Sequence, residues 1–310
     1  MVPSATSRAK RFERRDGPAN FQLTQRDLAL LAHVARHRFL SSRHLSALDG
    51  GSEQNVLRCL RVLFDHGYLD RPSAQLAHLP VMGPRPMVYG LGRRGAQALR
   101  QERGNSGETD WTERNKRAGA KFIEHTLAIA DLLVRLELAC RAREDVSMLS
   151  ENELLADAPE QTRRSREPLR LTVAGVDNGL GVSSVIPDAL FGLAFKDQTE
   201  SYFALEMDRS SMPVSRSRFD RTSFLRKLHV YLEAFKQGRH IAHYGLQQVR
   251  VLTVTDSRKR IDNMLAVLDE LTGSKGSHFF LFGTFGEANS LSPLDVAWTN
   301  GRGEIVKLTD

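Results

Sequence analysis

Cysteine is scarce in this sequence. Only two, Cys59 and Cys140, occur among 310 residues, and they form no C-x-x-C spacing. This excludes a disulfide framework and a thiolate zinc site, and it fits a reducing compartment. The sequence also lacks a run of about 18 apolar residues and an apolar N-terminal segment, so we expect neither a membrane span nor a signal peptide. A cytoplasmic protein without a membrane partner is therefore expected.

Nucleotide-binding motifs are missing as well. No G-x-x-x-x-G-K-[ST] sequence is present, which excludes a P-loop ATPase, and the segment 91–95 is too short for a dinucleotide fingerprint.

Positive charge, in contrast, is in excess. The sequence has 44 Lys and Arg against 37 Asp and Glu, a formal net charge of +7. This balance favours a polyanionic partner such as nucleic acid.

The chain is long enough for two domains of ordinary size. Residues 1–21 are basic and nearly free of apolar side chains, so we expect a flexible arm there. Residues 22–100 carry the capped helices of a first domain. Residues 101–117 are polar and contain two glycines, which indicates a linker, and a second domain is expected over 118–310.

The first domain shows three helix starts in succession. Thr24, Ser41 or Ser42, and Ser52 each precede an apolar stretch with helical spacing. Gly67 is suited to end the third helix. Two short strand-like segments, 68–71 and 87–89, follow with a Pro/Gly-containing tip between them, which predicts a hairpin, and a last helix begins near Arg93.

The third helix carries the candidate DNA-binding residues. Its apolar stripe is Val56, Leu57, Leu60, Leu63 and Phe64, and long polar side chains share the opposite face. Three helices followed by a hairpin resemble the winged helix-turn-helix domains of bacterial regulators and replication proteins. In such a domain the third helix contacts base edges and the hairpin contacts phosphates. The candidate contacts are Ser52, Gln54, Asn55, Arg58, Arg61, Arg71 and Arg85. The alternative is an ordinary solvated helix face.

The second domain alternates helical and strand-like segments. We expect helices over 119–142, 219–237 and 259–271, and strands over 146–149, 169–173, 185–193, 202–207, 249–254 and 279–282. This order predicts a mixed sheet with helices on its faces. The expected fold class is therefore α+β in two domains, a winged helix-turn-helix followed by a mixed α/β sheet domain.

Three acidic residues mark a candidate site in the second domain. Asp188 stands at the start of one strand, and Glu206 and Asp208 at the end of the next. Because side chains at i and i+2 point to the same face of a strand, the three carboxylates are placed to converge on Mg²⁺ or Mn²⁺. The arrangement resembles the PD-(D/E)xK nucleases and their restriction-endonuclease-like fold. The position of the family's lysine holds Asp208, so Arg226 or Lys227 from the following helix would substitute. The alternative is that the acids pair with Arg209, Arg216 or Arg218, or are the remnants of an inactive nuclease.

The full set of motifs resembles the replication-relaxation family. After the winged helix come Glu124-His125, then I-P-D-A-L-F, A-L-E-M-D-R and S-F-L-R-K-L-x-x-Y-L. The resemblance implies a role in replication, relaxation or mobilisation of plasmid or mobile-element DNA. Duplex DNA is the expected partner, and a second copy of the chain and replication or mobilisation proteins are further candidate partners. Two other hypotheses stay open. One is a metal-dependent endonuclease or nickase that uses Asp188, Glu206, Asp208 and Lys227, and the other is a transcriptional regulator.

Overall fold

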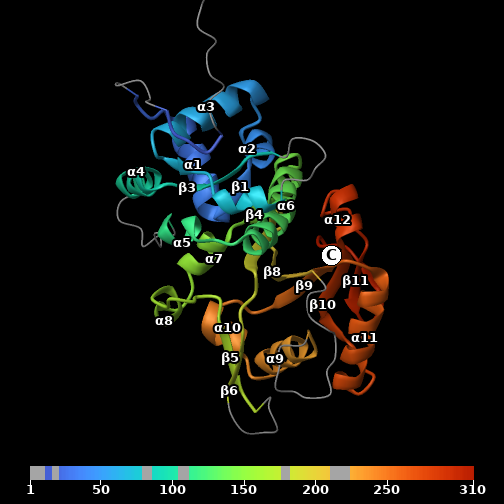
Figure 1. Ribbon diagram of the computed structural model, residues 1–310. Coiled ribbons are helices and arrows are strands. Elements are labelled where there is room, and N and C mark those ends of the chain that lie inside the picture. The colour runs from blue at the N-terminus through green and yellow to red at the C-terminus, as the bar shows by residue number, and fades with distance from the viewer. Residues whose placement is uncertain (1–10, 16–20, 79–85, 104–111, 176–181, 210–223) are drawn as a thin grey trace, which may run out of the picture. The chain divides into compact units, whose positions relative to one another are not determined.

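The computed structural model describes residues 11–15, 21–78, 86–103, 112–175, 182–209 and 224–310 (Figure 1). The chain divides into two compact units, residues 1–134 and 135–310, and the division falls within helix α6 (Ala120–Arg141). The domain boundaries expected from the sequence stay a prediction. In the part of the chain that is described, no helix has the length and apolar character needed to cross a membrane.

The first unit is mainly helical, and each of its first three helices begins near a residue predicted to cap it. Thr24 and Asp27 form a reciprocal capping box at α1, and Ser41 does the same with His44 at α2. Ser52 precedes α3 without a side-chain capping bond, and Gly67 follows α3 with φ of 77°. The elements are α1 (Gln25–His37), β1 (Phe39–Ser41), α2 (Ser42–Asp49), α3 (Glu53–Asp65), β2 (Leu69–Asp70), the 3-10 helix η1 (Ser73–His78), β3 (Val88–Leu91), α4 (Arg93–Arg103) and α5 (Thr112–Lys116).

A three-stranded sheet in the order β1-β3-β2 completes this unit. The predicted hairpin is confirmed, since β2 pairs antiparallel with β3, Leu69 opposite Leu91. Strand β1 was not predicted, because three residues are too few to show a period. It pairs with β3 through Phe39 opposite Gly90, and the buried Phe39, Val88 and Ile123 pack together.

A seven-stranded mixed sheet forms the centre of the second unit, in the order β12-β11-β10-β9-β8-β7-β4. Strands β8, β9 and β10 are parallel, and the pairs on either side are antiparallel. A separate antiparallel pair is formed by β5 and β6. The strands are β4 (Val146–Leu149), β5 (Leu171–Ala174), β6 (Val182–Val185), β7 (Ala189–Phe195), β8 (Glu200–Asp208), β9 (Val249–Thr255), β10 (Ser277–Thr284), β11 (Trp298–Gly301) and β12 (Ile305–Val306).

Helices α9 and α11 cover one face of this sheet around its largest core (Figure 1). Leu228 and Tyr231 from α9 and Met264 and Leu268 from α11 are buried there against Phe280. The helices of this unit, apart from the end of α6, are α7 (Glu151–Ala156), α8 (Glu160–Arg163), α9 (Phe224–Lys236), α10 (Arg239–Tyr244), α11 (Arg258–Thr272) and α12 (Phe285–Ser290). The mixed α+β composition with a large mixed sheet is therefore confirmed.

The strand predicted over 185–193 is confirmed from Ala189 onward, but its continuity with Val185 is wrong. The chain forms β6 up to Val185 and begins β7 at Ala189, with Ile186, Pro187 and Asp188 between them. Pro187 has no N–H to donate to a ladder, so the strand is interrupted at this residue. The break places the carboxyl group of Asp188 at the very start of β7.

Candidate functional site

The N-terminal half of α3 presents polar side chains to solvent. The fully buried residues are Val56, Leu60 and Leu63, which pack α3 against the rest of the first unit. On its other side a set that we call the α3 outer face is exposed: Ser52, Gln54, Asn55, Leu57 and Arg58. The sequence placed Leu57 in the apolar stripe, which is wrong, because its side chain is 39% exposed. The outer face thus combines hydrogen-bond donors with one apolar side chain, and the exposed carboxylate of Glu53 lies in the same first turn.

Two other candidate arginines are engaged within the protein. Arg61 forms an ion pair with Asp65, 2.9 Å between Nε and Oδ2, and donates to the Glu13 carbonyl. The guanidinium of Arg71 lies 4.2 Å from the centre of the Phe64 ring and donates to the Tyr89 hydroxyl at 3.0 Å. Burial lowers the pKa of Arg71. Arg85 lies outside the described residues.

In the second unit, one sheet face changes from apolar to polar towards the carboxyl ends of the parallel strands. Ala204 lies beside Val251, then Glu206 beside Thr253, then Asp208 beside Thr255. The Thr253 hydroxyl is buried and has no hydrogen-bond partner among the described residues. Ligands of α/β proteins bind at carboxyl ends of this kind, so this is the part of the sheet where chemistry is expected.

Asp188 connects the start of β7 to the end of β8. Its N–H donates to the Leu205 carbonyl at 2.8 Å, and its Oδ2 accepts a bond from the Met207 N–H at 2.8 Å. Its charge raises the pKa of Glu206, although burial is the larger cause. The structure therefore brings Asp188 and Glu206 together, as the sequence predicted from their places on neighbouring strands.

Glu206 is the most deeply placed of the three acids, with 2% of its side chain exposed. Lys227 Nζ donates to one carboxylate oxygen at 2.5 Å, and the Tyr231 hydroxyl donates to the other at 2.7 Å. Burial raises the pKa of Glu206 to about 7, and the charge of Lys227 opposes the rise. Lys227, one of the two residues expected to replace the motif lysine, thus contacts the second acid directly. Arg226 instead donates to the Ser183 hydroxyl at 3.1 Å.

Asp208 has an arginine partner that sequence reasoning missed. Arg260, at the start of α11, holds both carboxylate oxygens, with 2.9 Å between Nη2 and Oδ1. The Thr255 hydroxyl donates to Asp208 at 2.8 Å. Of the arginines considered as partners, Arg209 is exposed, and Arg216 and Arg218 lie outside the described residues. Arg260 is separated by 52 residues from Asp208, so no local pattern signals the pair.

These contacts bear on the predicted metal site. Both oxygens of Glu206 and both of Asp208 accept bonds from protein donors. Within the described part of the chain, no three His, Cys, Asp or Glu side chains are placed to hold a metal ion together. In this arrangement the carboxylates do not fit Mg²⁺ or Mn²⁺, and no catalytic step through a metal follows from the geometry.

A further carboxylate, not expected from the sequence, lies at the same end of β7. Glu151 Oε2 in α7 accepts a bond from the Leu190 N–H at 3.2 Å. Partial burial raises the pKa of Glu151 to about 7. Burial raises the pKa of Tyr244, and the charge of Glu151 adds to the rise.

Comparison with known proteins identifies the family. Residues 31–250, more than half of the chain, match the family model described as Replication-relaxation. No curated protein and no solved structure matches the chain. The matched range includes the α3 outer face and the cluster of Asp188, Glu206, Asp208 and Lys227. The chain therefore belongs to the replication-relaxation family.

Proposed function

We propose that this protein binds duplex DNA through a winged helix made of α1, α2, α3 and the sheet β1-β3-β2, with the α3 outer face in the major groove. Family membership suggests a role in replication or relaxation of plasmid or mobile-element DNA. The net charge of +7 favours a polyanionic partner in the same way. The proposed homodimer, the partner proteins and the regulator hypothesis stay predictions.

The observation that carries the proposal is the contrast between the two sides of α3. One side is anchored by fully buried leucines, while Gln54, Asn55 and Arg58 are exposed in the first two turns. A recognition helix contacts base edges with residues of its N-terminal half, and Gln, Asn and Arg are the side chains that form paired hydrogen bonds with bases. A rigid helix with free donors at this end is suited to that task.

Leu57 adds to this argument. It lies among these polar side chains on the same part of α3 and is 39% exposed. Apolar side chains in the major groove contact the methyl group of thymine. We therefore assign Leu57 to the DNA interface with Gln54, Asn55 and Arg58.

Fluorescence anisotropy with labelled duplex DNA tests this proposal. We expect the wild-type protein to bind at low salt and the Arg58→Ala variant to bind more weakly, with a salt slope reduced by about 1. Arg164→Ala is the matched control, because Arg164 is 79% exposed and lies in the other unit. Equal affinity of the Arg58→Ala and Arg164→Ala variants would remove α3 from the interface.

Metal-dependent DNA cleavage is a second candidate function. The contact between Lys227 and Glu206 favours it, because the resemblance to PD-(D/E)xK nucleases requires a lysine beside that acid. Cleavage would require an arrangement different from the one described, in which Arg260 releases Asp208 and Lys227 and Tyr231 release Glu206.

Supercoiled plasmid incubated with Mg²⁺ or Mn²⁺ tests the second candidate. A nuclease would give nicked or linear product with wild-type protein and none with Asp188→Asn, a change that keeps an acceptor for the Met207 N–H. Product formation by both proteins would point to a contaminating nuclease, and no product with either protein would remove this candidate.

A further inference from the structure

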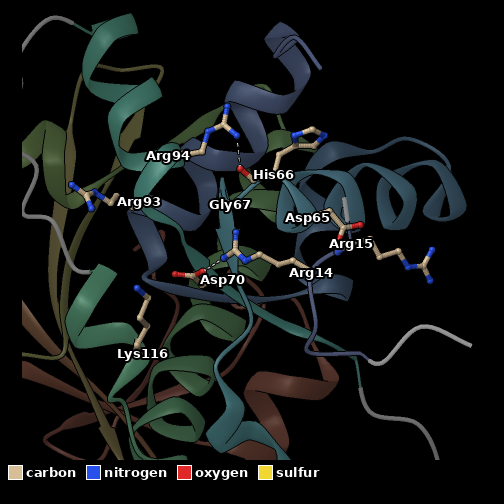
Figure 2. Close-up of a pocket in the computed structure, with 9 residues that line it drawn as sticks. All are labelled: Arg14, Arg15, Asp65, His66, Gly67, Asp70, Arg93, Arg94 and Lys116. Atoms are coloured by element: carbon tan, nitrogen blue, oxygen red, sulfur yellow. Dashed lines mark hydrogen bonds and ion pairs between the residues drawn. The ribbon is translucent and has the colours of Figure 1, made fainter. Parts of the chain in front are cut away.

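A basic pocket of about 620 Å³ lies at the C-terminal end of α3 (Figure 2). Four segments far apart in the sequence line it: residues 14–15, the end of α3 with β2, the start of α4, and α5. The lining residues are Arg14, Arg15, Asp65, His66, Gly67, Asp70, Arg93, Arg94 and Lys116. Of these residues, the sequence pointed only to Arg14 and Arg15, as part of the basic arm expected over 1–21.

Close backbone packing fixes the start of α4 beside the pocket. A Cβ on Gly92 would meet the Gly67 carbonyl oxygen at 2.5 Å, and one on Gly95 would meet the Tyr68 carbonyl oxygen at 2.3 Å. Arg94 donates to the His66 carbonyl at 2.9 Å, and its guanidinium lies 4.7 Å from the centre of the Tyr68 ring. The first turn of α4 is therefore held against the end of α3, and the pocket has a rigid wall.

Positive charge exceeds negative charge in this pocket. Five of its lining residues are basic and two, Asp65 and Asp70, are acidic. Asp70 is ion-paired with Arg14, and Asp65 with Arg61. Within the described part of the chain, the Arg93 side chain has no hydrogen bond or ion pair. Lys116 has only an exposed pair with Glu113, and such pairs contribute little stability. Arg93 and Lys116 are thus available to an anion.

We propose that this pocket holds a backbone phosphate of the duplex that the α3 outer face contacts. The proposal rests on the proposed function and adds a second contact to it. Asp65 follows Arg58 by seven residues, two turns and roughly 10 Å along α3, so the pocket continues the same side of the helix. Arginine forms paired hydrogen bonds with phosphate, and phosphate contacts fix the register of a protein on DNA.

The lining suits a phosphate group better than a whole nucleotide. His66 is the one aromatic ring in the lining, and its ring is stacked on Phe21 with 4.7 Å between ring centres. The guanidinium of Arg94 lies over the ring of the neighbouring Tyr68. A bound base would lack an open aromatic face there, whereas a phosphate needs only the cationic donors.

Ethylation interference tests the pocket, using a duplex selected from a random pool by the wild-type protein. Ethylation neutralises single phosphates, so it maps those that the protein contacts. In the variant Arg93→Ala/Lys116→Ala we expect interference to disappear at one or two phosphates beside the selected site, and the salt slope to fall by about 0.9 for each lost contact. Arg164→Ala/Lys196→Ala is the matched control, because it removes the same charges from exposed positions in the other unit.

The possible results separate this proposal from the proposed function. If the variant keeps the wild-type interference pattern and slope while Arg58→Ala weakens binding, the pocket proposal is overturned and the proposed function stands. A calorimetric titration with inorganic phosphate in the absence of DNA covers the other case. If phosphate binds the wild type but not the double variant, and no duplex binds either protein, the occupant is a small anion and the duplex assignment is wrong.

Discussion

Lys227 and Glu206 form an ion pair between α9 and β8 in which the acid is almost completely buried and the lysine is 30% exposed. The pair is surrounded by further charge, since the negative charges of Asp188 and Asp208 also act on Lys227. Burial lowers the pKa of Lys227, but the three acids outweigh it and the net pKa is raised. Lys227 therefore stays protonated at neutral pH.

Removal of Lys227 leaves Glu206 buried with Tyr231 as its remaining donor. We expect Lys227→Met to lower the free energy of unfolding by about 2 kcal/mol, less than for a fully buried pair because the lysine is partly exposed. Lys227→Met/Glu206→Gln should recover part of this loss, since the uncompensated acid is gone. Urea unfolding at pH 8 measures both, and a double variant less stable than Lys227→Met would contradict the interpretation.

Divalent cations should leave the wild-type protein unchanged. The carboxylate of Asp208 is hydrogen-bonded to Arg260, and that of Glu206 to Lys227 and Tyr231. We therefore expect Mg²⁺ or EDTA to shift the thermal unfolding midpoint by no more than the change in ionic strength does. A protein that binds the cation would gain about 2.7 kcal/mol at 100 times its Kd. Stabilisation by Mg²⁺ that is lost in Asp188→Asn would instead support the nuclease hypothesis.

Glu151 makes the stability depend on pH. Its pKa in the folded protein, about 7, lies above the ordinary value of 4.5, so the folded protein resists ionisation of this group. The stability that this group contributes is complete below pH 4.5 and is lost as the pH rises through about 7. We expect Glu151→Gln, which keeps an acceptor for the Leu190 N–H, to be more stable than wild type at pH 8 by on the order of 2 kcal/mol. Both proteins should be equally stable near pH 4, and a difference that does not vary with pH would contradict the assignment.

Two leucines on α3 should behave in opposite ways. Leu60 is fully buried, so Leu60→Ala should lower the free energy of unfolding by about 2 to 5 kcal/mol. Leu57 is on the outer face, so Leu57→Ala should change stability by less than about 1 kcal/mol and weaken DNA binding instead. Urea unfolding and fluorescence anisotropy on the same samples measure the two effects. If Leu57→Ala binds DNA as the wild type does, Leu57 does not belong to the interface.

Local signals predicted much of the fold. The capping pair of Thr24 and Asp27 fixed the start of α1, and the run from Val249 predicted β9 within a residue of its observed end. Short elements without a period were missed, among them β1 in the first unit and the strands β11 and β12 after the last predicted strand. These strands have only two to four residues, which is too few to show an alternating pattern, and β1 pairs with a strand distant in the sequence.

Only those parts of the candidate site that depend on residues close together in the sequence could be predicted. The i, i+2 spacing placed Glu206 and Asp208 on one face, and the short connection between β7 and β8 brought Asp188 to them. Which donors neutralise these acids depends on tertiary packing, so Arg260 and Tyr231 were not found. Arg71 likewise packs on Phe64 and Tyr89, contacts that its charge alone does not indicate, and its predicted phosphate contact stays a prediction.

The base preference of the protein tests the central claim most directly. Duplexes would be selected from a random pool with the wild type, with Asn55→Ala and with the control Arg164→Ala. If α3 lies in the major groove, Asn55→Ala should bind with relaxed preference at one or two adjacent base pairs, a loss of about 1 to 3 kcal/mol in discrimination, while Arg164→Ala selects the wild-type sequence. An identical sequence selected by all three proteins would contradict base recognition by α3.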